Sequence, residues 1–430
     1  MAYPQFRFLP AVLCLALSLS AGLSGCTTVG MAEASSHMGS SVSDGVARQA
    51  SNVGSLFGGG PQKPALSVPV FIVSTRKGGA NSTELTPGAQ ARYALNFINV
   101  PPGHNSGVIE TPNFGGPDPE RHFTVTSRRS LDDTQFEAEV AAHVSGRIGV
   151  NRDVLIYVHG FNTSFEEARF RLAQIVVDSE FGGVPVLFTW PSKSALLAYG
   201  ADKESATASR DAYFKLLTQL SETPGIGRIH ILAHSMGTWL TMETLREQAL
   251  SGAPDLHGHL GDVMLAAPDI DLSVFKQQIA RLDPSHFSVF VSKGDRALQV
   301  SASIQGDRRL GAIDPGSEAD REMIDKLGVK VFDISDLQQN LIGHDSYTAP
   351  QVVRSIGAQM SEPRKSDGVA SQAVIDAGAD RSAPPPPPVV VAAPAVPTDA
   401  LPAAPPLASP NAISSEPLPP PVAVAPVAAQ

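Results

Sequence analysis

The sequence predicts an α/β fold built on a mainly parallel sheet. In residues 66–360, short runs rich in apolar and β-branched residues alternate with longer stretches of helical periodicity, as in successive βαβ units. Some of these runs, such as 154–158, are continuously apolar, which is typical of strands buried on both faces of a parallel sheet. With 430 residues, 42% of them hydrophobic, the chain can build a large core. We therefore expect one folded domain at 66–360, with helices on both faces of its sheet.

The strands and helices of this domain can be placed along the chain. Two of the expected strands have a proline near their start, where a strand loses no ladder hydrogen bond. The expected strands are 68–73, 154–158, 184–188, 229–232, 263–266, 287–291 and 329–332, and the expected helices are 164–179, 203–220, 237–250 and 349–360.

Residues 1–25 are typical of a secretory signal peptide. Arg7 supplies positive charge, and an apolar run from Phe8 to Leu23 follows it and ends in small residues. The alternative is an uncleaved anchor helix, although the run is short for a membrane span. Cys14 lies within this segment, so cleavage removes it and leaves the mature chain without a disulfide.

The end of the signal segment, 23–26, reads Leu-Ser-Gly-Cys and resembles the bacterial lipobox. In that motif the cysteine thiol forms a thioether to lipid, and the small residues before it give access to the peptidase. The resemblance implies that Cys26 anchors the protein to a membrane of the cell envelope. Thr27 stands where an aspartate would favour retention in the inner membrane. We therefore expect the protein on the periplasmic face of the outer membrane.

Low-complexity segments flank the expected domain. Residues 26–65 are rich in Ser, Gly and Ala, which predicts a flexible tether. Residues 361–430 are rich in Pro, Ala and Val, which predicts a disordered or polyproline-like tail. The tail is either a spacer or arm for an envelope partner, or an inert extension.

Composition and missing motifs exclude several classes of function. The net charge is −10 and no Lys/Arg-rich block is present, so we expect no nucleic-acid partner. The sequence has no H-E-x-x-H motif, Walker loop or dinucleotide fingerprint. His257 and His259 are too sparse for a metal site without further ligands. We expect neither a metal nor a cofactor.

A candidate nucleophile lies where a predicted strand meets a predicted helix. Residues 232–237 read Leu-Ala-His-Ser-Met-Gly, which resembles the G-x-S-x-G nucleophile elbow with Ala233 in place of the first glycine. That turn needs small residues two before and two after the serine, so that strand and helix can approach. Ser235 is therefore the expected nucleophile of an α/β-hydrolase fold. The alternative is an ordinary helix-capping serine.

An oxyanion-binding loop is expected upstream of the nucleophile. Residues 158–162 read Val-His-Gly-Phe-Asn and follow directly on a buried strand. In the α/β-hydrolase fold this loop supplies one backbone N–H to the oxyanion, and the residue after the nucleophile supplies the other. The expected donors are the amides of Phe161 and Met236. The alternative is a plain strand-to-helix turn at Gly160.

The base and the acid follow from the chain order of this fold, which is Ser, then Asp or Glu, then His. His344 lies in a loop after the last predicted strand, and no histidine follows it. Asp295 follows the penultimate strand and is the expected acid, while Asp269 follows the strand before it and is the alternative. We expect Ser235, Asp295 and His344 to form a catalytic triad.

Together these segments resemble the bacterial α/β-hydrolase family called domain of unknown function 900. The matching segments are 157–162, 188–192, 233–237, 265–269, 294–298 and 343–347, and the resemblance covers roughly 68–360. The resemblance implies an esterase or lipase-like activity and supplies no substrate.

We therefore expect a serine hydrolase that cleaves small-molecule or lipid esters through an acyl-enzyme. Trp190 and Tyr199 follow a strand and are candidates for lining the substrate pocket, although aromatic residues there are as often core. Two alternatives stay open. A thioesterase or amidase would use the same triad, and an envelope scaffold or binding protein could keep the fold without turnover.

Overall fold

The computed structural model describes residues 65–362, except 194, 196–197, 306–307 and 338–342. All described residues belong to one unit of the chain, Gln62–Gln430. The expected signal peptide, Cys26, the expected tether up to residue 64 and the expected tail beyond residue 362 lie outside the described residues.

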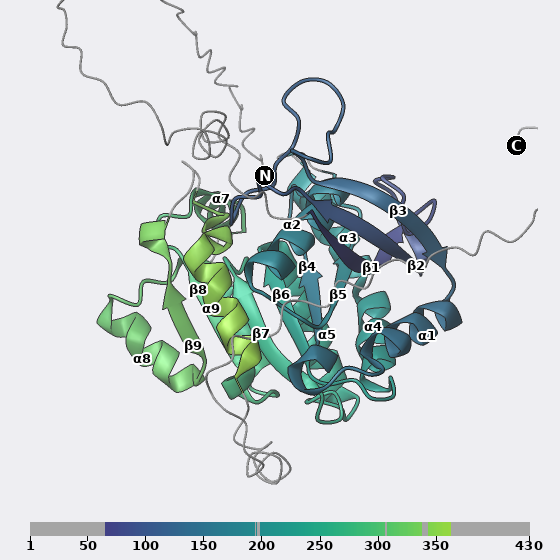
Figure 1. Ribbon diagram of the computed structural model, residues 1–430. Helices are drawn as coiled ribbons and strands as arrows, with labels where there is room; N and C mark the ends of the chain where they lie inside the picture. Colours follow the sequence, from purple (N-terminus) through teal and green to yellow (C-terminus); the bar gives the residue numbers. More distant parts are fainter. Residues whose placement is uncertain (1–64, 194, 196–197, 306–307, 338–342, 363–430) are drawn as a thin grey trace, which may run out of the picture. The chain divides into compact units, whose positions relative to one another are not determined.

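A nine-stranded sheet forms the centre of the described part of the chain (Figure 1). Its strand order is β3-β2-β1-β5-β4-β6-β7-β8-β9. The strands in the run β1-β5-β4-β6-β7-β8-β9 are parallel to one another. At one edge of the sheet, β2 pairs antiparallel with β1, and β3 pairs antiparallel with β2. This confirms the mainly parallel sheet and all seven expected strands. The bounds are β1 Leu66–Arg76, β2 Pro87–Val100, β3 Thr124–Leu131, β4 Val154–Val158, β5 Val184–Thr189, β6 Ile229–His234, β7 Leu260–Ala266, β8 Phe287–Val291 and β9 Lys330–Asp333.

The antiparallel strands β2 and β3 were not expected from the sequence. The residues of β3, Thr-Val-Thr-Ser-Arg-Arg-Ser-Leu, are mostly exposed and include two arginines. Charged residues on an edge strand discourage pairing with another chain, and they also remove the apolar signal by which a strand is recognised.

Helices lie between the strands, and one of the four expected helices is divided in two. The pattern at 203–220 predicted one helix, but α3 and α4 meet at Ser209. The Ser209 hydroxyl donates to the carbonyl of Ser205 and lies 2.7 Å from the hydroxyl of Thr75 on β1, which stabilises the break. The α-helices are α1 Asp133–Val144, α2 Phe165–Asp178, α3 Tyr199–Ala208, α4 Arg210–Ser221, α5 Met236–Leu250, α6 Leu272–Ile279, α7 Arg296–Gln305, α8 Glu318–Leu327 and α9 Pro350–Ser361.

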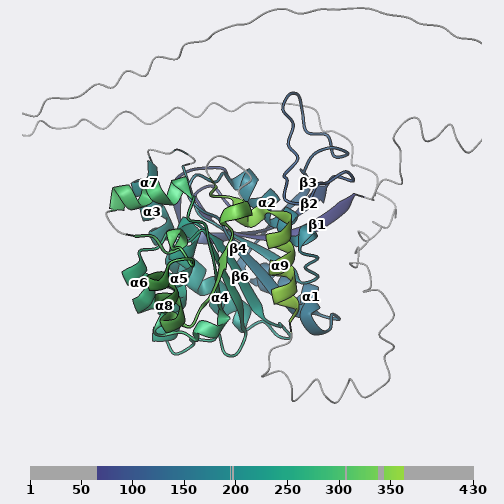
Figure 2. The ribbon, with the colours of Figure 1, turned by 90° about the vertical axis from the view of Figure 1, so that its left-hand side faces the viewer.

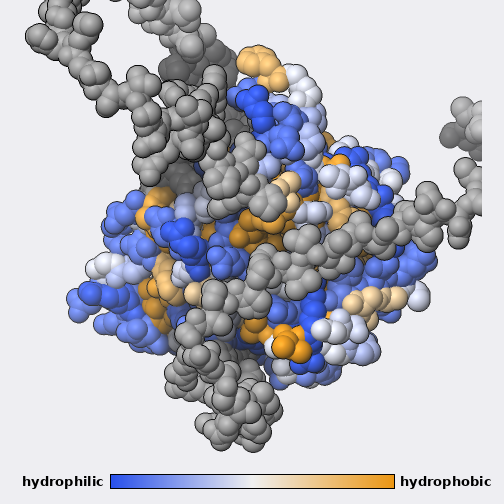
Figure 3. All heavy atoms as spheres, in the orientation of Figure 1, coloured by the Kyte–Doolittle hydropathy of each residue, from blue (hydrophilic) through white to orange (hydrophobic). Residues whose placement is uncertain are grey.

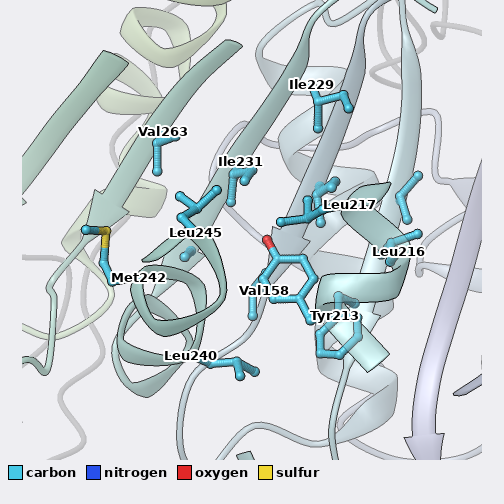
Figure 4. Packing of buried hydrophobic residues seen from close by; sticks show 14 of the residues in the cluster. Val158, Tyr213, Leu216, Leu217, Ile229, Ile231, Leu240, Met242, Leu245 and Val263 are labelled. Carbon is cyan, nitrogen blue, oxygen red and sulfur yellow. The ribbon is translucent and has the colours of Figure 1, made fainter. Parts of the chain in front are cut away.

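The helices cover both faces of the sheet, and each face has its own hydrophobic cluster (Figures 1 and 2). One cluster joins the sheet to α1, α3, α4, α5 and α6. Figure 4 shows part of it, where side chains of α4 and α5 pack on Val158, Ile229 and Ile231. The other cluster joins the sheet to α2 and α9. Burial on both faces accounts for the continuous apolar runs of the central strands.

The strand order determines where a site can form. From β4 the chain crosses to β5 on one side, and it then returns to β6 on the other side of β4. The connections therefore diverge at the carboxyl ends of β4 and β6, where open α/β sheets bind their ligands. These ends are adjacent, because Val158 pairs with Ala233.

On the face drawn in Figure 3, the visible described residues are mainly hydrophilic, with apolar side chains in smaller areas. Among the described residues, no helix has both the length and the apolar character needed to cross a membrane.

Candidate active site

Ser235 lies at a strained turn between β6 and α5. Its backbone has φ 50° and ψ −122°, a conformation that costs a non-glycine residue about 1–3 kcal/mol. Although Ser235 occupies the N-cap position of α5, its side chain makes no capping hydrogen bond. An ordinary capping serine has extended backbone angles, and its side-chain oxygen accepts a hydrogen bond from a backbone N–H in the first turn of the helix. The geometry is therefore that of a nucleophile elbow, not of a cap.

The small residues around Ser235 are required by close backbone contacts. A Cβ on Gly237 would lie 2.5 Å from the carbonyl oxygen of His159, so only glycine lets α5 approach β4. A Cβ on Gly160 would lie 2.7 Å from Cβ of Ser235. Ala233 is fully buried in the strand below. The loop after β4 and the nucleophile turn are therefore in direct contact.

A buried histidine connects the loop after β4 to the end of β5. His159 Nε2 lies 2.9 Å from Oγ1 of Thr189, and its ring stacks on Trp190 at 5.0 Å between centroids. Burial, followed by the charge of Arg76, lowers the pKa of His159 to about 3, so this ring is neutral. His159 therefore supports the loop as a neutral, buried ring.

The two expected oxyanion donors lie next to the contact between Gly160 and Ser235. Met236 is the first residue of α5, and Phe161 follows Gly160. Within the described residues, neither backbone N–H donates a hydrogen bond, so both are available to a ligand. Sequence reasoning did not identify Asp202 of α3, which accepts hydrogen bonds from the amides of Asn162 and Lys193 and so ties this loop to the segment after β5.

His344 and Asp295 form a direct pair. Nδ1 of His344 lies 2.7 Å from Oδ2 of Asp295, which is completely buried in the turn between β8 and α7. The other carboxylate oxygen accepts the backbone N–H of Leu298 at 3.0 Å. Because Asp295 fixes the proton on Nδ1, Nε2 of His344 carries the lone pair that a general base needs.

The environment of His344 favours its protonated form. Burial lowers the pKa of His344, but the hydrogen bond and charge of Asp295, together with Asp345 and Asp269, outweigh burial and raise it. Nε2 makes no hydrogen bond within the described residues, and Ser235 Oγ is not bonded to it. Such contacts are often long in unliganded enzymes and tighten when substrate binds.

Asp269, the alternative acid, has different partners. Its carboxylate accepts hydrogen bonds from Tyr199 Oη at 2.7 Å and Ser301 Oγ at 2.6 Å, and it lies 3.3 Å from Nε of Arg309. Its backbone N–H donates to the carbonyl of Ser235 at 3.3 Å. Asp269 therefore stabilises the wall beside the nucleophile, while Asp295 is the carboxylate that holds His344.

The two aromatic residues expected in a substrate pocket differ. Trp190 is a correction, because it is completely buried and its indole Nε1 donates to the carbonyl of His159. It belongs to the core beneath the loop after β4. Tyr199 is half-buried and its ring lies edge-on to Phe161 at 5.5 Å between centroids, beside the site. It stays a candidate for contact with substrate.

A second feature that sequence reasoning did not identify is the side chain of His234. Its Nε2 lies 3.3 Å from the backbone carbonyl oxygen of His344, and the two rings lie 4.7 Å apart. The sequence signal was its position next to Ser235, but the partner is 110 residues away. In the part of the chain that the structure describes, no group of His, Cys, Asp and Glu side chains could hold a metal.

The sheet order, the elbow at Ser235 and the helices on both faces define an α/β hydrolase. Residues 132–362 match the family described as alpha/beta hydrolase of unknown function (DUF900). This match spans more than half of the chain, and the protein belongs to that family. No curated protein shows significant similarity to the chain.

Solved structures similar to this chain include three hydrolases or hydrolase-related proteins. Esterases from the fungus Rhizomucor miehei are 12% identical, with a TM-score of 0.33, over 70% of this chain and 84% of theirs. An acetyl xylan esterase is 13% identical, with a TM-score of 0.28, over 48% and 98%. A proline iminopeptidase-related protein from Thermus thermophilus is 14% identical, with a TM-score of 0.25, over 50% and 91%.

Proposed function

We propose that the protein is a serine hydrolase that cleaves carboxylic esters through an acyl-enzyme. The observation that carries the proposal is the His344–Asp295 pair. The backbone of His344 contacts His234, the residue before Ser235, and Ser235 itself lies in a strained turn without making a capping hydrogen bond. Strain at a functional turn is retained only where the surrounding structure enforces it, and here it presents the Ser235 hydroxyl.

In the proposed reaction, His344 Nε2 accepts the proton of Ser235 Oγ as that oxygen attacks the ester carbonyl carbon. The amides of Phe161 and Met236 donate to the oxyanion of the tetrahedral intermediate. Asp295 stabilises the imidazolium, which then gives its proton to the departing alcohol. Water, activated by the same histidine, releases the acid and restores Ser235.

Labelling with a fluorophosphonate tests this proposal. The purified protein is expected to form a covalent adduct that peptide mass spectrometry assigns to Ser235. Hydrolysis of matched p-nitrophenyl esters, thioesters and anilides then distinguishes an esterase from a thioesterase or an amidase. A folded protein that neither reacts with the probe nor hydrolyses any of these substrates would favour the non-catalytic scaffold.

We also propose that the protein acts from the membrane surface, through a lipid on Cys26, at the periplasmic face of the outer membrane. The lipobox-like sequence at 23–26 supports this location, and lipid esters are then accessible substrates. Metabolic labelling with an alkyne fatty acid, followed by membrane fractionation, tests the anchor. The variant Cys26→Ala is expected to lose the label and stay soluble.

A further inference from the structure

The side chain of His234 has no role in the acyl transfer described above. On β6 it points to the face that α2 and α9 cover, because Leu232, two residues earlier, packs in that cluster. The ring of His234 is buried and only 4% exposed. It lies between the loops that carry the base and the oxyanion donor.

On one side, His234 contacts the histidine loop. Its Nε2 is 3.3 Å from the carbonyl oxygen of His344, and its ring lies 4.5 Å from that of Tyr347. The Tyr347 hydroxyl is in turn 2.9 Å from the hydroxyl of Tyr157 on β4. The histidine loop is thereby attached to the centre of the sheet.

On the other side, His234 contacts the oxyanion loop. A Cβ on Gly160 would lie 3.0 Å from Nδ1 of His234, so the ring lies close to this loop and leaves no room for a side chain there. A displacement of the ring would therefore affect both the base and the oxyanion donor.

The protonation state of His234 is defined by its partners. A carbonyl oxygen only accepts, so Nε2 carries the proton and Nδ1 is bare in the neutral ring. Burial, followed by the nearby charge of His344, lowers the pKa of His234 to about 3, although Asp345 and Asp295 act in the opposite direction. The ring is therefore neutral at physiological pH. A cation at this distance would disfavour the imidazolium that His344 must become.

We propose that His234 is a positioning residue, whose Nε2–H holds the backbone of His344 so that its imidazole stays aligned between Asp295 and Ser235. The inference rests on the proposed serine-hydrolase function. Because His234 does not contact the reacting atoms, its loss acts through geometry. A misplacement of about 1 Å in such a constellation lowers turnover on the order of a hundred-fold.

Two substitutions separate the hydrogen bond from the packing of the ring. His234→Phe keeps an aromatic ring and removes the donor, while His234→Gln keeps an N–H donor and removes the ring. The matched control is His286→Phe, since His286 is also buried and its Nδ1 lies 2.8 Å from the carbonyl of Gly261 at the start of β7. Hydrolysis of p-nitrophenyl butyrate is measured as kcat, KM and the pH profile of kcat/KM.

His234→Phe is expected to lower kcat roughly ten- to hundred-fold with little change in KM. The acidic limb of its kcat/KM profile is expected to move to lower pH. A displaced His344 loses the stabilisation of its cation by Asp295, Asp345 and Asp269, so its pKa falls. His234→Gln is expected to recover most of the turnover. His286→Phe is expected to change thermal stability without moving kcat or the acidic limb.

Wild-type kcat and pH profile in His234→Phe would overturn the inference. Equal losses in the Phe and Gln variants with an unmoved acidic limb would also overturn it, because packing alone would then explain them. If His234→Phe does not fold, His234→Met serves as the variant without a donor. If the wild type neither hydrolyses the ester nor reacts with fluorophosphonate at Ser235, the proposed function itself fails. If the wild type is active and His234→Phe is unaffected, only the positioning role of His234 fails.

Discussion

A histidine–aspartate pair lies at each end of the sheet. The two pairs differ in whether the second ring nitrogen of the histidine has a hydrogen-bond partner. At the carboxyl ends of the strands, Nδ1 of His344 is 2.7 Å from Asp295. At the amino ends, Nε2 of His230 is 3.2 Å from Asp153. Residue types alone would not distinguish the two pairs.

The partners of the second nitrogen make the difference. Nδ1 of His230 accepts the backbone N–H of Asp262 at 3.0 Å, and Arg228 pairs with Asp153 at 3.1 Å, so this network is closed. The side chain of His230 is completely buried, whereas that of His344 is 16% exposed. Within the described residues, Nε2 of His344 has no hydrogen-bond partner. A His–Asp pair can act as a base where one nitrogen stays open beside a nucleophile, and otherwise it is structural.

The largest expected effect is that of Ser235→Ala. Loss of the nucleophile from a triad costs on the order of a million-fold in kcat. Turnover of p-nitrophenyl butyrate measures it, and circular dichroism checks the fold. The control is Ser288→Ala on β8, where a buried hydroxyl bonds Gln359 and its loss costs about 1 kcal/mol of stability but no turnover. More than about one per cent residual turnover in Ser235→Ala would refute the assignment.

The acid of the proposed triad gives the next largest expected effect. Asp295→Asn is expected to lower kcat on the order of ten-thousand-fold, because the amide favours the wrong imidazole tautomer. Asp269→Asn is the matched control and is expected to cost far less, since Tyr199, Ser301 and Arg309 surround its carboxylate. Steady-state kinetics on both variants decide the matter. The reverse order would make Asp269 the acid.

A substitution in the His230–Asp153 pair, at the amino ends of the strands, is expected to lower stability without changing turnover. Asp153→Asn leaves the mostly buried guanidinium of Arg228 without its counter-ion, which costs about 3–5 kcal/mol of unfolding free energy. Urea titration measures this loss, and kcat of the folded variant is expected to match the wild type. A large fall in kcat would show that the two ends are coupled.

The His344–Asp295 pair is also expected to define how kcat/KM depends on pH. Only neutral His344 can accept the proton of Ser235, so kcat/KM rises with pH through the pKa of His344. Burial lowers this pKa, but Asp295, Asp345 and Asp269 raise it overall above the ordinary histidine value of about 6.5. The midpoint of the acidic limb is therefore expected above that value. A midpoint below it would mean that the Asp295 pair is broken in solution.

The smallest expected effect is that of removing the tail. The many prolines of the tail lack backbone N–H donors and its apolar residues are mostly Ala and Val, so we predict that it does not pack on the domain. Truncation should follow Glu362, whose carbonyl accepts a hydrogen bond from Arg228. Esterase kinetics and melting temperature are expected to match the full chain. A large fall in either would contradict the prediction.

Much of the site could be read from the sequence because its signals are local. The elbow at Ser235 needs small neighbours on a strand-turn-helix, and these are consecutive residues. His344 followed from chain order, since no later histidine exists. The parallel strands followed from continuous apolar runs, which burial on both faces requires.

What the tertiary structure decided depended on residues far apart in the chain. Asp295 and Asp269 both follow strand ends. They were separated by the contact of His344 with Asp295, whereas Ser301 and Arg309 lie beside Asp269. Trp190 was placed in the core because His159 stacks on it. Periodicity and turn chemistry report on neighbours within a few residues, whereas a hydrogen bond such as that between His234 and His344 depends on how the sheet brings distant loops together.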